Sequence, residues 1–230
     1  MPLLCELAEL VLKETGEPLD AVMSYANFTL QNETLYTKGL DRLRKAGVSC
    51  VPNASPLGMG LLRSQGVPVG GNGDFHPAPP GLRKAVAEAA RWVESKNGSL
   101  AVLSIRWALE TWARKGGMKA GEIGVSVGGV STVAELEETA RVWRSVLDGL
   151  DIPGRKSEET ERQWSAKRKV EVEEYAVGVR NILGEWMDYV WPSPEKGYVN
   201  IRAVKGVVDS VAPLPEGKEK TSGADKISRL

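Results

Sequence analysis

One stretch of the sequence, residues 48–62, constrains the fold most, because it combines a strand-like segment with a glycine-containing loop. Val48, Cys50 and Val51 form a short apolar run bounded by a glycine and a proline, which is typical of a buried strand. The Ser-Pro-Leu-Gly-Met-Gly segment at residues 55–60 follows, and its small residues leave backbone N–H groups accessible. The pattern predicts a strand ending in a phosphate-sized loop, although the same hexapeptide also fits an ordinary tight turn.

Strand-like and helix-like segments alternate along the first two thirds of the chain. Short apolar segments predict strands, and longer segments with apolar residues three or four positions apart predict helices. Because strands separated by helices form parallel sheets, we expect an α/β fold. The predicted strands are residues 20–25, 48–51 and 122–127, and the predicted helices are residues 3–15, 34–46, 82–96, 100–115 and 131–147.

The last predicted helix has a well-defined start. Gly128 and Gly129 form the turn before it, and Thr132 with Glu135 three residues later matches a full capping box. The tryptophans on the predicted helices lie among alanine, leucine and valine, so we expect them in the core or between helices: Trp92, Trp107, Trp112 and Trp143.

The composition excludes several classes of function. With 30 basic and 30 acidic side chains in 230 residues, no global field favours nucleic acid or an anionic membrane. No stretch approaches roughly 18 uninterrupted apolar residues, and we expect no metal site. A small neutral molecule is therefore the expected ligand, and the oligomeric state is left open.

The cysteine content and the C-terminus bear on the compartment. Cys5 and Cys50 are the two cysteines, so we expect free thiols in a reducing, cytoplasmic environment. The C-terminal tripeptide Ser228-Arg229-Leu230 is a variant of a peroxisomal signal, which leaves the peroxisome as an alternative.

The last third of the chain differs in character. Residues 154–174 are dominated by charge and predict a solvated helix, and an apolar cluster at residues 177–191 is expected to cap one end of the domain. From about residue 215 the chain lacks core-forming residues and is expected to be disordered. The expected divisions are a domain at residues 1–150, a charged and apolar helical extension at residues 151–200 and a tail at residues 201–230.

Three segments give the sequence a resemblance to a known family. They are Leu-Asp-Ala-Val-Met-Ser-Tyr-Ala-Asn-Phe-Thr-Leu at residues 19–30, Asn-Ala-Ser-Pro-Leu-Gly-Met-Gly-Leu-Leu at 53–62 and Asp-Phe-His-Pro-Ala-Pro at 74–79. In this order they resemble the C-terminal half of the aldo-keto reductases, and among these the branch of D-arabinose and L-galactose (aldose) 1-dehydrogenases. The resemblance implies a partial (β/α)8 TIM barrel, made of about the last three strands and their helices, with a C-terminal helical extension.

The resemblance also implies a nicotinamide cofactor, NAD or NADP. Ser55, Leu57 and Gly58 match the family's loop around the cofactor pyrophosphate, which agrees with the usual phosphate site of such barrels after the seventh and eighth strands. Enzymes of this branch oxidise the anomeric carbon of an aldose to a lactone. An aldose is therefore the implied substrate.

A second cofactor segment is implied after the last predicted strand. Gly128 and Gly129 permit close approach of the backbone, and the following helix N-terminus favours negative phosphate. Glu138 and Thr139 match the positions that contact adenine. Where many NADP-dependent members have an arginine for the ribose phosphate, this sequence has Ser131, so NAD is favoured over NADP.

For the substrate side, the resemblance implies that Tyr25 and His76 lie at the mouth of the site. The family's catalytic tyrosine, lysine, aspartate and histidine come from earlier strands, so no catalytic residue is assigned in this chain. We expect the chain alone to be inactive, as the C-terminal portion of an oxidoreductase left by a truncated gene model or a split gene. The alternative is an inactive remnant that serves as a nucleotide-binding or protein-interaction module.

Overall fold

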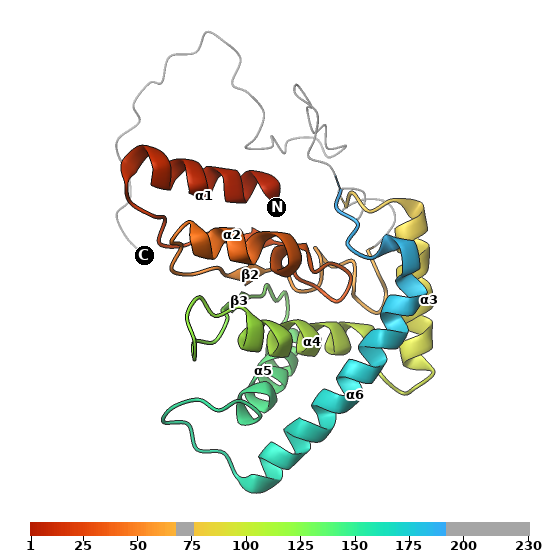
Figure 1. The fold of residues 1–230 in the computed structure, drawn as a ribbon. Coiled ribbons are helices and arrows are strands. Elements are labelled where there is room, and N and C mark those ends of the chain that lie inside the picture. The colour runs from red at the N-terminus through yellow and green to blue at the C-terminus, as the bar shows by residue number, and fades with distance from the viewer. Residues whose placement is uncertain (68–75, 192–230) are drawn as a thin grey trace, which may run out of the picture. The chain divides into compact units, whose positions relative to one another are not determined.

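The computed structural model describes residues 1–67 and 76–191, and everything up to Trp191 belongs to one folded unit (Figure 1). The expected tail at residues 201–230, its expected disorder from about residue 215 and the C-terminal tripeptide lie outside the described residues. So does part of the glycine-rich segment before His76.

A small parallel sheet lies at the centre of the described unit. Its strands are β1 (Ser24–Tyr25), β2 (Asn53–Ala54) and β3 (Ser126–Val127), in the spatial order β1-β2-β3. Both pairs are parallel, and Asn53 pairs with Ser24 on one side and Ser126 on the other. The expected α/β class with parallel strands is therefore confirmed.

The middle strand lies further along the chain than predicted. Residues 48–51 were expected to form it, but the ladder begins at Asn53, and only an isolated bridge joins Cys50 to Ala21. Asn53 is fully buried, and its Nδ2 donates to the Phe28 carbonyl at 2.9 Å. A buried polar residue with such a partner can continue a strand that an apolar pattern would end at Val51.

Six α-helices accompany the sheet in the described part (Figure 1). The first five lie close to their predicted bounds, except that a π-helical turn, η1 (Leu35–Gly39), replaces the first turn of the second one. The last one runs from Glu159 to Leu183, where a helix at residues 154–174 was expected. A 3₁₀ turn, η3 (Gly184–Trp186), follows the last helix. The helices are α1 (Pro2–Thr15), α2 (Leu40–Lys45), α3 (Pro80–Glu94), α4 (Leu100–Lys115), α5 (Val133–Asp148) and α6 (Glu159–Leu183).

An aromatic group anchors the core. The Phe28 ring lies 4.7 Å from the Trp112 ring and 5.3 Å from the Trp107 ring, measured between centroids. Trp107 and Trp112 are buried, as predicted, and Trp92 packs edge-on against Tyr175 at 5.8 Å. Both cysteines are free thiols, which was also predicted.

Helix α6 is more than the solvated helix expected for residues 154–174. It packs against α3, α4 and α5, and its inward face carries buried residues. Gly178 lies on this face, where a side chain would collide with the Trp92 ring. The charge run dominated the sequence pattern, but the spaced residues between the charges supply the packing face: Ser165, Val172, Ala176, Val179 and Leu183.

Two absences concern the described residues alone. None of their helices is both long and apolar enough to cross a bilayer. Nor do they contain a group of three or more histidine, cysteine or acidic residues arranged to hold a metal ion.

Candidate functional site

The carboxyl ends of the three strands open into loops at one edge of the sheet. The register pairs Tyr25 with Ala54 and Ala54 with Val127. Backbone bonds continue one residue further, since Ser55 N donates to Val127 O at 3.1 Å and Ala26 N to Ala54 O at 2.9 Å. Because parallel α/β sheets bind ligands at this edge, the loops after the strands form the candidate site.

The loop after β2 has an unusual backbone that its own hydrogen bonds support. Ser55, Gly58, Met59 and Gly60 have φ angles of 60°, 58°, 60° and 87°, a region that favours glycine. The Ser55 Oγ accepts from the Met59 N–H at 2.8 Å, and the Ser55 carbonyl accepts from the Gly58 N–H at 2.9 Å. The hydroxyl oxygen of Ser55 therefore braces the loop itself.

Two backbone donors of this loop are left for a ligand. Among the described residues, the N–H groups of Leu57 and Gly60 have no acceptor. Both residues are half-buried, whereas Gly58 between them is buried. Backbone N–H groups that lack an acceptor are available to donate to an anion, so this loop is compatible with a phosphate group.

His76 supports the same loop. It is 3% exposed, its Nε2 lies 2.9 Å from the Gly58 carbonyl oxygen, and its Nδ1 accepts from the Ala78 N–H at 3.1 Å. Burial lowers the pKa of the imidazole, the Gly58 bond partly opposes this, and the Arg83 charge lowers it further. The sequence predicted His76 at the substrate mouth, and the structure has it buried against the phosphate-sized loop.

The loop after β3 leads into the N-terminus of α5. Thr132 Oγ1 accepts from the Glu135 N–H at 3.1 Å, which confirms the predicted N-cap. The predicted full capping box is wrong in its second half, because the Glu135 carboxylate accepts from the Ser131 N–H at 2.7 Å and does not return to Thr132. The N–H groups of Val133 and Ala134 have no partner in the described part of the chain, as usual in a first helical turn.

The predicted adenosine-side residues remain accessible. Gly128, Gly129 and Ser131 are exposed before α5, and Glu138 and Thr139 lie exposed and half-buried within the helix. Tyr25, on β1, is 56% exposed. Within residues 1–67 and 76–191, no hydrogen bond or ion pair connects Tyr25, Glu138 or Thr139 to the loop after β2.

An ion pair that the sequence did not predict connects the two loops. Arg63 Nη2, just beyond the loop after β2, lies 4.0 Å from Glu135 Oε1. Glu135 thus contacts the backbone of Ser131 and puts a negative charge there. The capping pattern alone accounted for Glu135, and Arg63 belongs to no motif, so no sequence signal indicated this pair.

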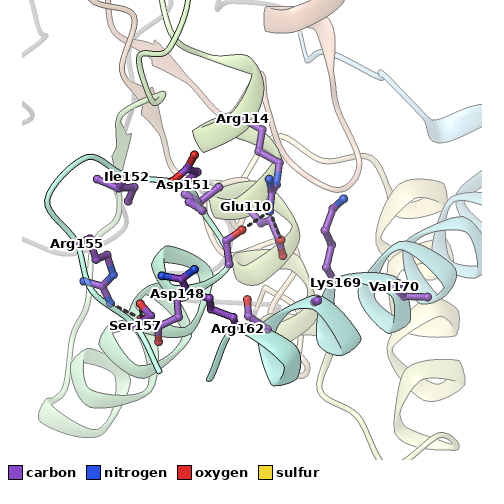
Figure 2. Close-up of a pocket in the computed structure, with 14 residues that line it drawn as sticks. Glu110, Arg114, Asp148, Asp151, Ile152, Arg155, Ser157, Arg162, Lys169 and Val170 are labelled. Carbon is purple, nitrogen blue, oxygen red and sulfur yellow. Dashed lines mark hydrogen bonds and ion pairs between the residues drawn. The ribbon is translucent and has the colours of Figure 1, made fainter. Parts of the chain in front are cut away.

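A separate cavity of about 670 Å³ lies between the C-terminal turns of α4 and α5 and the N-terminal half of α6 (Figure 2). Arg114 pairs there with Glu110 at 3.3 Å, and Arg155 pairs with Asp148 at 2.5 Å. Burial would raise the pKa of Asp148, but hydrogen bonds from Arg155 and Ser157 outweigh it and lower the pKa. None of the predicted site residues lines this cavity, so it is separate from the candidate site.

Comparisons with known proteins identify relatives. The model of the aldo/keto reductase family matches residues 5–153. The chain is 40% identical over 119 residues to D-arabinose 1-dehydrogenase of Saccharomyces cerevisiae, an alignment that covers 52% of this chain and 32% of the yeast protein. It is 33% identical over 120 residues to L-galactose dehydrogenase of Arabidopsis thaliana, covering 52% and 33% respectively. The chain spans about a third of the length of the curated relatives it matches.

Proposed function

Since this chain belongs to the aldo/keto reductase family, we propose that it binds the nicotinamide nucleotide of an aldose 1-dehydrogenase. The family implies a TIM-barrel type of fold, of which a three-stranded parallel sheet with flanking helices is a part. One observation carries the proposal. The N–H groups of Leu57 and Gly60 are free in a braced loop at the carboxyl end of β2, beside the N-terminus of α5.

Each part of the site has a proposed role toward the nucleotide. The free N–H groups of Leu57 and Gly60 donate to the pyrophosphate oxygens. The Val133 and Ala134 N–H groups and the positive end of the α5 dipole favour the adenosine-side phosphate. When bound, the nucleotide supplies the group that accepts a hydride. The residues present therefore fit the cofactor that the family implies.

The finer proposal is that NAD is preferred over NADP. The Glu135 carboxylate holds the Ser131 N–H, at the position where the resemblance implies an arginine in NADP-dependent members. A carboxylate there repels a ribose 2′-phosphate, and acidic residues in other nucleotide sites accept from the ribose hydroxyl. The adjacent Arg63 is already paired with Glu135.

We further propose an aldose as the substrate, oxidised at C1 to a lactone, with Tyr25 lining its site. The names of the yeast and plant relatives support this substrate class. We also propose that this chain alone does not turn over a sugar. His76 supports that view, because its Nε2–H and Nδ1 are engaged by Gly58 and Ala78 and are not presented to a substrate.

The proposal is tested by isothermal titration calorimetry of the 230-residue protein with NAD⁺ and NADP⁺. We expect NAD⁺ to bind, and to bind more tightly than NADP⁺. Ser55→Ala removes the hydroxyl that braces the loop and should weaken binding several-fold, whereas Ser49→Ala, an exposed serine before the sheet, is the matched control. No detectable binding of either nucleotide would refute the proposed function.

A second candidate function is that of an inactive interaction module. It is favoured by apolar side chains exposed on α1, where Leu3, Leu7 and Leu10 are 66%, 47% and 49% exposed. Two further apolar side chains are exposed near the edge strand β3. Val127, on β3, is 44% exposed, and Val133, at the start of α5, is 72% exposed. Soluble, monomeric protein with a cooperative melt, seen by sedimentation and calorimetry, would favour this candidate, and aggregation would count against it.

A further inference from the structure

His76 joins three parts of the molecule that are distant in sequence. Its imidazole bonds the Gly58 carbonyl in the loop after β2 at 2.9 Å, and its own carbonyl accepts from Arg83 Nη2, on α3, at 2.7 Å. The ring also packs edge-on against Trp191, with centroids 5.2 Å apart and planes at 68°. The buried ring thus contacts the phosphate-sized loop and the end of the described chain, and the backbone carbonyl of the same residue contacts a helix.

The hydrogen bonds of the ring define its orientation and protonation. Because Nδ1 accepts from the Ala78 N–H, the proton of the neutral ring is on Nε2, where it donates to the Gly58 carbonyl. A proton on Nδ1 would oppose the Ala78 N–H. Only one ring orientation and the neutral form therefore satisfy both partners.

The segment just before Trp191 is hydrogen-bonded to Gln31. Gln31, in the loop after β1, donates through Nε2 to the carbonyls of Trp186 at 2.7 Å and Tyr189 at 3.2 Å. The Asp188 backbone N–H donates to the Gln31 carbonyl at 2.9 Å. The segment that ends at Trp191 is therefore fastened to the loop after β1 and touches the support of the loop after β2.

We propose that His76 is a positioning residue for nucleotide binding, which holds Gly58 and thereby the free N–H groups of Leu57 and Gly60, and that Trp191 steadies its ring. This inference rests on the proposed function. The loop is strained at Ser55 and Met59, two non-glycine residues at positive φ, so support from outside is required to keep it in one conformation. A preorganised loop loses less entropy when it binds a phosphate. By linkage, a bound nucleotide must stabilise the contacts of His76 to the same extent.

Two substitutions separate the hydrogen bond from the packing of the ring. His76→Phe keeps an aromatic ring beside Trp191 but has no donor for Gly58, whereas His76→Gln keeps a donor at similar reach. His76→Phe also loses the acceptor for the Ala78 N–H. We expect it to raise the calorimetric Kd for NAD⁺ roughly two- to tenfold, and His76→Gln to restore most of the affinity. If His76→Phe does not fold by circular dichroism, Trp191→Ala is the substitute, because it removes the ring contact but leaves the hydrogen bonds of His76 in place, and it should weaken binding in the same direction.

Nuclear magnetic resonance gives a readout, the imidazole signals of His76 on addition of NAD⁺, that should stay unchanged if the residue were purely structural. The sequence holds one histidine, so the imidazole ¹H–¹⁵N signals belong to His76 without further assignment. We expect the Nε2–H tautomer, and a shift of these signals on addition of NAD⁺ with the same midpoint as the calorimetric titration.

The outcomes distinguish this inference from the function on which it rests. If NAD⁺ binds the wild type and His76→Phe equally well and the imidazole signals do not shift, the inference is overturned while the proposed function stands. If neither NAD⁺ nor NADP⁺ binds the wild type, the proposed function fails and the inference falls with it.

Discussion

The two loops of the candidate nucleotide site differ in how firmly they are held. The loop after β2 is braced by Ser55 from within and by His76 from outside, and Gly58 at its centre is buried. The loop after β3 is exposed, and a side chain added at Gly128 or Gly129 would meet nothing within 4 Å. We infer a division of labour. The braced loop supplies affinity for the phosphates common to both nucleotides, and the open loop, with its acidic residue, decides between them.

The largest effect is expected from removing the support of the braced loop. His76→Leu leaves the Gly58 carbonyl and the Ala78 N–H without their partner, and each buried polar group left unpaired costs about 1–3 kcal/mol. We expect the free energy of unfolding to fall by about 3 kcal/mol in urea denaturation. Ser131→Ala, in the open loop, is the control and should change it by less than about 0.5 kcal/mol. Equal losses at the two positions would contradict the comparison.

Acidification should weaken the braced loop in a smaller, graded way. The folded pKa of His76 lies below its unfolded value, so the unfolded state binds more protons just below about pH 6.5. The contribution of the neutral ring is complete above the unfolded pKa and is lost as the pH falls toward the folded pKa. Between pH 7.5 and 5.5, the free energy of unfolding should fall more in the wild type than in His76→Leu. The variant is the control because it shares the titration of every other group.

A substitution in the open loop should change the selectivity between NAD⁺ and NADP⁺. Glu135→Gln keeps an acceptor for the Ser131 N–H and removes the charge, so we expect affinity for NADP⁺ relative to NAD⁺ to rise about tenfold, or about 1.4 kcal/mol. Calorimetry with both nucleotides measures the ratio. Glu137→Gln, an exposed neighbour on α5, makes the same change in net charge and should leave the ratio unaltered. A similar ratio in both variants would show that Glu135 does not discriminate.

The same contrast explains what the sequence could predict. The bounds of α1, α3, α4 and α5, the parallel pairing of the strands and the Thr132 cap depend on local patterns, and the structure confirms them. The start of β2 was missed because Asn53 is a buried polar residue whose partner lies 25 positions away. The contacts of His76 with Gly58 and Trp191 were missed for a related reason. They join segments that are close only after folding, and no local periodicity encodes such contacts.

The smallest effects should separate stability from binding at two glycines. Gly58 has φ of +58°, and a Cβ there would be an unstrained 3.7 Å from the Leu61 Cβ, so Gly58→Ala should cost only the conformational strain of about 1 kcal/mol. Gly129 has no such φ and no neighbour in reach, so Gly129→Ala should leave the free energy of unfolding unchanged. The new methyl group would nevertheless occupy the surface that the nucleotide is proposed to approach. We therefore expect Gly129→Ala to weaken NAD⁺ binding without a change in melting temperature. Unchanged affinity would mean that the nucleotide contacts α5 without approaching the Gly129 backbone, and the open loop would then act through Glu135 alone.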